Sequence, residues 1–80
     1  MDQVVYITGG SKGIGKGIAS YLLQKGYRVA ISSRKREAAE QAAAELGQSD
    51  RILPLQSDVR RLTDEQQAVA TILEKWGRLD

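Results

Sequence analysis

Short apolar runs alternate along the chain with longer segments in which apolar residues recur at helical spacing. The apolar runs predict β-strands at residues 4–8, 28–33 and 52–57. The periodic segments predict helices at residues 14–25, 35–46 and 64–76. Gly26, Gly47 and Gly77 follow these helices directly, where glycine commonly ends a helix. The pattern therefore predicts three successive strand–helix units.

Each predicted helix carries one apolar stripe that we expect to face a sheet. The first stripe contains Ile14, Ile18 and Leu22, with Ala19 and Leu23 beside it. The second contains Ala38, Ala39, Ala42, Ala43 and Leu46, and the third contains Val69, Ile72, Leu73 and Trp76. Thr63 and Gln66 have the spacing of a capping box, so we expect the third helix to begin after Thr63.

Strands that alternate with helices of this length favour an α/β fold with a parallel sheet and right-handed crossovers. Pro54 lies within the third strand and cannot donate a backbone hydrogen bond, so we expect that strand at a sheet edge. The doubly wound strand order 3-2-1-4 places it there. The chain is therefore predicted to hold the first three strand–helix units of a Rossmann-type doubly wound parallel sheet.

Composition argues against several other classes of protein. The 80 residues include no cysteine and no histidine, which excludes a disulfide and argues against a metal site. The net charge of +2 and the scattered basic residues argue against nucleic-acid binding. No apolar run approaches the roughly 20 residues that span a membrane, and the start of the chain lacks a signal-peptide pattern. We expect a cytoplasmic protein with neither a membrane nor a nucleic-acid partner.

A glycine-rich segment, TGGSKGIG at residues 8–15, joins the first strand to the first helix. Backbone N–H groups and the helix N-terminus favour a phosphate at such a junction, and glycine permits its close approach. The P-loop pattern fits from Gly10 to Lys16 but needs a hydroxyl where Gly17 stands. The pattern G-x-G-x-x-G, begun at Gly13, needs a small residue where Ile18 stands. A purely structural alternative is that these glycines form only tight turns.

The segment does match the spacing T-G-x-x-x-G-x-G, and in this it resembles the short-chain dehydrogenase/reductase family. Asp58 and Val59 match the Asp-Val/Leu pair of that family, and residues 77–80 resemble the start of its fourth strand. The resemblance covers the whole chain. It implies that residues 1–80 are the N-terminal half of a dinucleotide-binding Rossmann domain, truncated at the start of the fourth strand. It also implies hydride transfer between NADP(H) and a carbonyl or alcohol substrate.

Cofactor contacts are implied along the glycine segment and at the ends of the second and third strands. The first group is Thr8, Gly9, Ser11, Lys12, Gly13, Ile14 and Gly15. A basic side chain at the end of the second strand suits the 2′-phosphate of NADP, whereas an acidic one suits the 2′-OH of NAD. Ser33 can donate a hydrogen bond there, and Arg34 can form a forked pair with phosphate. Lys12 could approach from the glycine segment, so we predict NADP rather than NAD.

Two of these assignments have structural alternatives. Residues 34–36 could be the solvated start of a helix, an interpretation that suits Arg36 and Lys35 better than Arg34. Asp58 could accept from the adenine amine while Val59 N–H meets a ring nitrogen, or it could be a turn or capping aspartate.

The resemblance places the catalytic serine, tyrosine and lysine beyond residue 80, so we predict no catalytic residue in this chain. Tyr21 and Lys25 have tyrosine-x-x-x-lysine spacing, but a helical surface pair explains it. We expect the chain to belong to a longer, homo-oligomeric enzyme. The alternatives are a non-catalytic dinucleotide-binding or redox-sensing module, and a pseudo-enzyme fragment that acts through its exposed sheet edge. The open edge of the first strand also predicts that the isolated chain is marginally stable or insoluble.

Overall fold

The computed structural model describes residues 3–9, 13–47 and 50–80. Strands and helices alternate along the chain in the order β1 (Val4–Thr8), α1 (Gly13–Gln24), β2 (Arg28–Ser33), α2 (Arg36–Leu46), β3 (Ile52–Gln56) and α3 (Leu62–Trp76). Every predicted strand and helix is present. Two strands have the predicted bounds, and the other elements differ by one or two residues at an end.

The three strands form one parallel sheet in the order β1-β2-β3, which confirms the predicted α/β topology. Ser57 N donates to Ser33 O, and Arg51 O accepts from Val29 N. Odd-numbered residues of β3 therefore direct their backbone groups at β2, because these groups alternate in direction along a strand. Pro54 accordingly points away from β2, and its missing N–H interrupts no hydrogen bond within the sheet.

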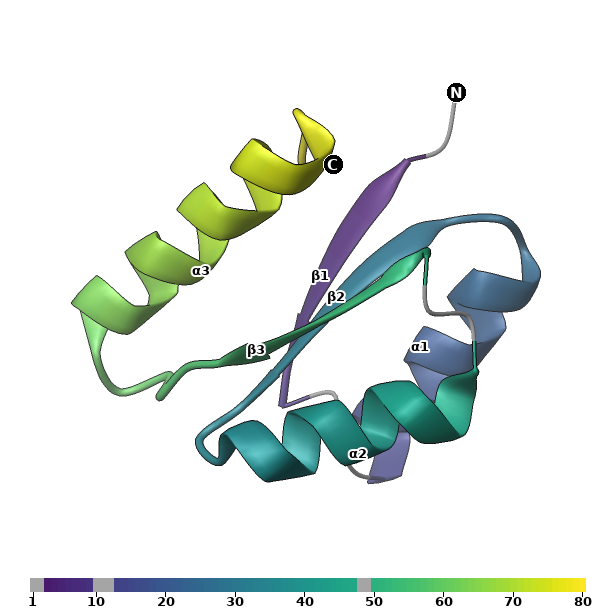
Figure 1. Cartoon of the computed structure of the whole chain (residues 1–80), viewed down its shortest axis with the longest axis horizontal. Helices are drawn as coiled ribbons and strands as arrows, with labels where there is room; N and C mark the ends of the chain where they lie inside the picture. Colours follow the sequence, from purple (N-terminus) through teal and green to yellow (C-terminus); the bar gives the residue numbers. More distant parts are fainter. Residues whose placement is uncertain (1–2, 10–12, 48–49) are drawn as a thin grey trace.

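Helices cover both faces of the sheet, so the fold has three layers (Figure 1). The α1 and α2 helices pack on one face, where the buried cluster consists of Ala19, Leu23, Val29, Ile31, Ala42 and Ile52. The α3 helix packs on the other face, where Val4, Ala30 and Ile72 are buried beside partly buried Tyr6 and Trp76. These two clusters hold the strands in place from opposite sides.

Two of the predicted apolar stripes are wrong by about one helical position. Ile14 and Ile18 are 84% and 47% exposed, whereas Ala19 and Leu23 of the same helix are buried. Likewise, Leu73 is 45% exposed although Ile72 is buried. The spacing of apolar residues identifies a helix, but which side it buries depends on the neighbouring strands. No described element covers the side of α1 that carries Ile14 and Ile18.

Glycines end the second and third helices as predicted. Gly47 and Gly77 have left-handed backbone conformations, with φ of 77° and 76°, and each donates its N–H to the carbonyl four residues earlier. The capping box at Thr63 is wrong, because α3 begins at Leu62 and has Arg61 as its N-cap. Glu65 N already donates to Arg61 O, so helical hydrogen bonding starts before Thr63.

Residues 78–80 lie alongside the beginning of β1. Asp80 N donates to Val4 O at 2.8 Å, and Val4 N donates to Asp80 Oδ2 at 2.9 Å. Arg78 forms a forked ion pair with the same Asp80 carboxylate. Since Gln3 O accepts from Arg28 N on the β2 side, the backbone groups of Val4 face the opposite side, where Asp80 lies.

Candidate functional site

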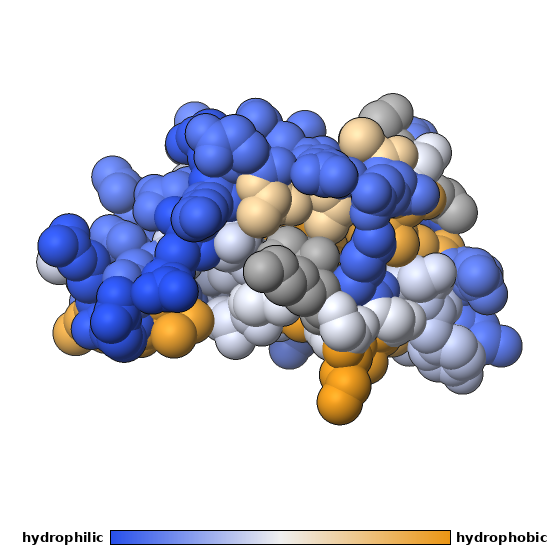
Figure 2. Space-filling view, turned by 90° about the horizontal axis from the view of Figure 1, so that it is seen from below, coloured by the Kyte–Doolittle hydropathy of each residue, from blue (hydrophilic) through white to orange (hydrophobic). Residues whose placement is uncertain are grey.

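The candidate site residues gather where the three parallel strands end. In open α/β sheets, ligands bind outside the carboxyl ends of the strands. These ends point toward the lower left of Figure 1, and Figure 2 views the molecule from below. Blue, hydrophilic side chains cover much of that face, and orange, apolar ones emerge in separate places. Thr8, Ser33 and Asp58 stand at or just beyond the ends of their strands.

The turn after β1 has the backbone that the glycine segment predicts, as far as it is described. Gly9 and Gly13 have φ of 69° and 55°, values that residues with a Cβ atom rarely adopt. A Cβ added at either position would meet nothing within 4 Å. The segment therefore needs glycine for its backbone conformation and leaves open space beside it. Ser11 and Lys12 lie outside the described residues.

The α1 helix begins at Gly13, so its N-terminus faces the end of β1. No acidic residue lies in its first turn. Ile14 and Gly15 occupy that turn, and Ile14 projects into solvent. A helix N-terminus of this kind carries a partial positive charge and free N–H groups, which together suit an anionic ligand.

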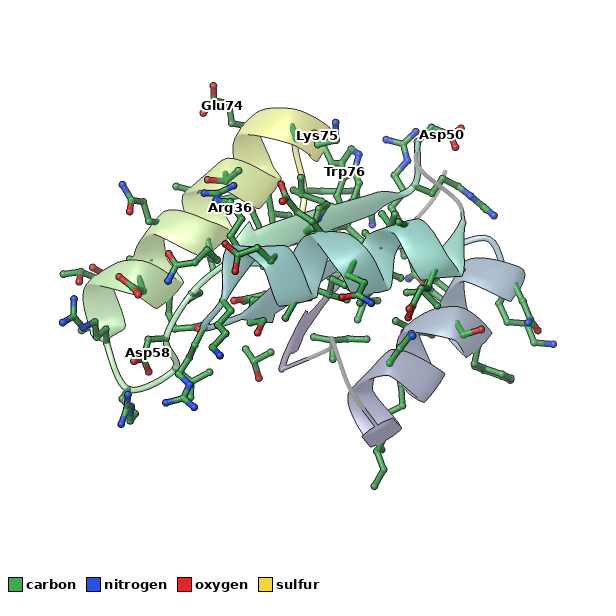
Figure 3. The ribbon with its side chains drawn as sticks, turned by 60° about the horizontal axis from the view of Figure 1, so that its bottom comes forward. Arg36, Asp50, Asp58, Glu74, Lys75 and Trp76 are labelled. Carbon is green, nitrogen blue, oxygen red and sulfur yellow. The ribbon has the colours of Figure 1, made fainter. Side chains whose placement is uncertain are left out.

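The end of β2 presents a hydroxyl and a guanidinium. Ser33 Oγ accepts from Lys35 N at 3.3 Å, and Arg34 O accepts from Gln56 Nε2 at 3.1 Å. Arg34 is exposed, and its guanidinium pairs with no carboxylate in the described part of the chain. It is therefore available to an external anion. Arg36 follows as the first residue of α2 (Figure 3).

Asp58 lies in the loop between β3 and α3 (Figure 3). Its Oδ1 accepts from Arg60 N at 3.0 Å and from Arg60 Nε at 3.1 Å. Its Oδ2 accepts from Arg60 Nη2 at 2.9 Å. These bonds, with a smaller contribution from the charge of Arg34, hold the pKa of the Asp58 carboxyl well below its usual range. Asp58 is thus a turn residue in this structure, and its contact with adenine stays a prediction.

A polar cluster beside this loop was not anticipated from the sequence. Tyr6 Oη lies 3.1 Å from Ser32 Oγ and 3.2 and 3.3 Å from the two Glu65 carboxylate oxygens. Ser57 Oγ donates to Glu65 Oε1 at 2.9 Å. Burial raises the pKa of the Tyr6 hydroxyl, and the negative charge of Glu65 adds to this effect. Tyr6 therefore remains a protonated donor at neutral pH.

One sequence signal could have indicated this cluster. Tyr6 and Ser32 are polar residues within mainly apolar strands, where Tyr6 pairs with Ala30 and Ser32 pairs with Thr8. Even-numbered residues of β1 pair with even-numbered residues of β2, so Tyr6 and Ser32 share a face of the sheet. Glu65 is 59 residues from Tyr6, and nothing in local spacing connects the two.

The remaining candidates behave as surface residues. Tyr21 and Lys25 form a surface pair at the C-terminal end of α1, as predicted, and Lys25 Nζ lies 5.5 Å from the centre of the Tyr21 ring in a cation–π contact. No group of three or more acidic residues that could hold a metal occurs within residues 3–9, 13–47 and 50–80. In the same ranges, none of the helices has the length and apolar character needed to cross a membrane.

Comparison with known proteins identifies the family of the chain. Residues 3–80 match the family model described as short chain dehydrogenase. The chain therefore belongs to the short-chain dehydrogenase/reductase family, which confirms the resemblance carried by Thr8–Gly15, Asp58 and Val59.

Several relatives match over the whole chain. It is 40% identical to the 3-oxoacyl-[acyl-carrier-protein] reductase of Bos taurus over 80 residues, which are 100% of this chain and 33% of that protein. A crystal structure of a short chain dehydrogenase from Bacillus anthracis superimposes with a TM-score of 0.92 and 46% identity, over 98% of this chain and 33% of that one. The 3-ketoacyl-(acyl-carrier-protein) reductase from Brucella melitensis, complexed with NADH, gives a TM-score of 0.90 and 35% identity over 98% of this chain and 31% of that one. The chain thus spans about a third of the length of these relatives.

Proposed function

We propose that this chain is the NADP(H)-binding part of an oxidoreductase that transfers a hydride between NADP(H) and a carbonyl or alcohol substrate. The observation that carries the proposal is the junction of β1 and α1, where Gly9 and Gly13 leave open space beside a helix N-terminus. Arg34, which pairs with no carboxylate among the described residues, stands at the end of the adjacent strand. A nicotinamide dinucleotide bound at this edge would supply or accept the hydride.

Each part of the site suits a different part of the cofactor. The pyrophosphate carries negative charge and fits the N-terminus of α1, with Thr8, Gly9, Ser11, Gly13, Ile14 and Gly15 around it. Asp58 and Val59 stand at the end of β3, where we propose that they contact adenine. Val59 is 60% exposed, so its backbone N–H lies in an accessible part of the loop.

The preference for NADP over NAD rests on the end of β2. No carboxylate stands there to accept from a ribose 2′-OH, and Ser33 and Arg34 offer donors to a 2′-phosphate. Lys12 is a further candidate for that phosphate. The NADH in the Brucella melitensis relative supports dinucleotide binding in the family.

Substitution Arg34→Asp in the full-length protein tests the proposal. Loss of a charge-assisted pair with phosphate, together with repulsion from the new carboxylate, should weaken NADP binding by roughly 30-fold or more. Binding of NAD, which has no 2′-phosphate, should change little. The ratio of the two dissociation constants, measured by titration calorimetry, is the relevant quantity.

Arg36→Asp provides the matched control, because Arg36 has the same charge two residues further along and begins α2. It should leave the ratio of NADP to NAD affinity near the wild-type value. An unchanged ratio in Arg34→Asp, or an equal loss in both variants, would show that Arg34 does not select the cofactor.

The activity of the whole protein is also a proposal. We propose a cytoplasmic homo-oligomer whose substrate is a small carbonyl or alcohol. Oxidation of NADPH by the full-length protein in the presence of carbonyl compounds would support an enzyme. Tight NADPH binding without turnover of any carbonyl or alcohol would instead support a non-catalytic dinucleotide-binding or redox-sensing module.

A further inference from the structure

Two consecutive carboxylates in the first turn of α3 hold the loop that precedes it. Asp64 Oδ2 accepts from Asp58 N at 3.0 Å, and Glu65 Oε1 accepts from Ser57 Oγ at 2.9 Å. Both donors belong to the segment that leaves β3, and both acceptors belong to the same helix. The path of the chain at Ser57 and Asp58 is therefore fixed by α3 as well as by the sheet.

Glu65 also contacts β1. Both of its carboxylate oxygens lie within hydrogen-bond distance of Tyr6 Oη, which in turn lies 3.1 Å from Ser32 Oγ. Tyr6 is two residues before Thr8, where β1 passes into the glycine segment. One carboxylate thus connects the strand that leads to the proposed pyrophosphate site with the loop that leads to the proposed adenine site.

Burial makes the hydrogen bonds of Glu65 costly to break. Ser32 and Ser57 are 0% and 1% exposed, so their hydroxyls are shielded from solvent. A polar group in such surroundings loses much more free energy when its partner is removed than an exposed one does. A rearrangement of Glu65 would remove the carboxylate that accepts from the Ser57 hydroxyl, so the present position of Glu65 favours the observed path of the loop.

We infer that Glu65 is a positioning residue for the adenosine end of the cofactor, because it holds Ser57 and thereby sets where Asp58 and Val59 stand relative to β1. This inference rests on the proposed function. Glu65 acts through Ser57 and Tyr6, which contact it from two other elements of the fold.

Substitution Glu65→Gln in the full-length protein tests the inference. Glutamine keeps the shape of the side chain but is neutral and replaces one acceptor oxygen with an NH2 donor, so the charge-assisted bonds from Tyr6 and Ser57 are weakened. We expect the affinity for adenosine monophosphate, measured by titration calorimetry, to fall about 10-fold. The KM for NADPH should rise by a similar factor, while kcat at saturating NADPH stays near the wild-type value.

Two further variants separate positioning from general stability. Glu74→Gln changes another carboxylate of α3, one that is exposed and projects away from the sheet (Figure 3), and should leave affinity for adenosine monophosphate unchanged. Ser57→Ala removes the Ser57–Glu65 hydrogen bond from the other side while Tyr6 still contacts Glu65. Ser57→Ala replaces Glu65→Gln as the test if the latter does not fold. We expect it to show the same loss of affinity for adenosine monophosphate. The double variant should lose no more than the larger single change.

The possible outcomes distinguish this inference from the proposed function. Wild-type affinity for adenosine monophosphate in both Glu65→Gln and Ser57→Ala would overturn the inference and leave the proposed function standing. A parallel fall in kcat and in affinity would also overturn it, because that is the behaviour of a structural residue. A wild-type protein that binds neither adenosine monophosphate nor NADPH would overturn both.

Discussion

Arg34 and Arg60 follow the ends of two neighbouring strands, yet their surroundings differ. Arg60 forms a forked pair with Asp58, whereas Arg34 pairs with no described carboxylate. A guanidinium already paired with a carboxylate must give up that pair to bind phosphate, and an unpaired one does not. At the scale of single residues, pairing therefore distinguishes Arg34 from Arg60 as the arginine that is ready to bind an anion.

The Asp58–Arg60 pair gives a prediction for pH dependence. Because pairing depresses the folded-state pKa of Asp58, it contributes stability that is fully present above the unfolded value of about 4. That contribution is lost as pH falls through the folded-state pKa. In Arg60→Gln, we expect the titration midpoint of the Asp58 carboxyl, followed by carbon NMR, to rise toward its ordinary value.

Arg61→Gln is the control for this titration, since Arg61 is the exposed neighbour of Arg60 and contacts Asp58 through its backbone, with Arg61 N donating to Asp58 O. It should leave the Asp58 midpoint low. A midpoint in the ordinary range for aspartate in the wild-type protein would show that the pair does not persist in solution.

The contacts of single residues were harder to predict from the sequence than the strands and helices were. The glycine spacing and the basic residues after β2 could be recognised because they are local. The contacts of Glu65 with Tyr6 and Ser57 join segments far apart in the sequence, so they follow only from the folded sheet. At Asp58 the structure shows the bonds of a turn residue to Arg60, while the adenine contact stays a prediction.

At the scale of elements, we expect substitution of glycine by alanine to have opposite effects on stability at two positions. Gly77 ends α3 with a φ of 76°, so Gly77→Ala forces a left-handed alanine and should cost about 1–2 kcal/mol. Gly17 lies within α1, where an added Cβ meets nothing within 4 Å. Gly17→Ala should therefore stabilise the protein by about 0.5–1 kcal/mol.

Denaturant unfolding of the two full-length variants beside the wild type measures both effects. Each variant serves as the control for the other, because the chemical change is the same. A shift of the same sign in both would mean that backbone conformation does not govern these positions.

Elements were predicted well and their buried sides less well, for one physical reason. A run of apolar residues bounded by glycine specifies a strand or helix within its own segment, as at Val4–Thr8 and Arg28–Ser33. The buried side of α1 depends on where β1 and β2 lie beneath it. Ala19 faces them and Ile18 does not, although both fit a helical apolar pattern.

At the scale of the whole molecule, apolar side chains remain exposed in the described part of the chain. Ile14, Tyr21 and Leu62 are 84%, 60% and 72% exposed. In addition, β1 pairs with β2 on one side only, apart from the Asp80 contact at Val4. A sheet edge with exposed apolar surface nearby favours association between chains.

We therefore expect the 80-residue chain, expressed by itself, to associate or precipitate at micromolar concentration. Sedimentation velocity over a range of concentrations measures this directly. A soluble monomer with a cooperative thermal unfolding transition would contradict the expectation and would show that the three strand–helix units suffice for a stable fold.

Because Pro54 lies in β3, a further strand would pair more completely beside β1 than beside β3. During synthesis the strands are added outward, from β1 to β2 to β3. The outer edge of β3 then contains Pro54, which has no N–H to donate to a further strand. Any strand that joins this sheet afterwards has its complete set of partners only beside β1, the oldest strand on the ribosome. The first strand to be made would thus gain its second neighbour only after β2 and β3 were in place, while β3 would stay an edge strand.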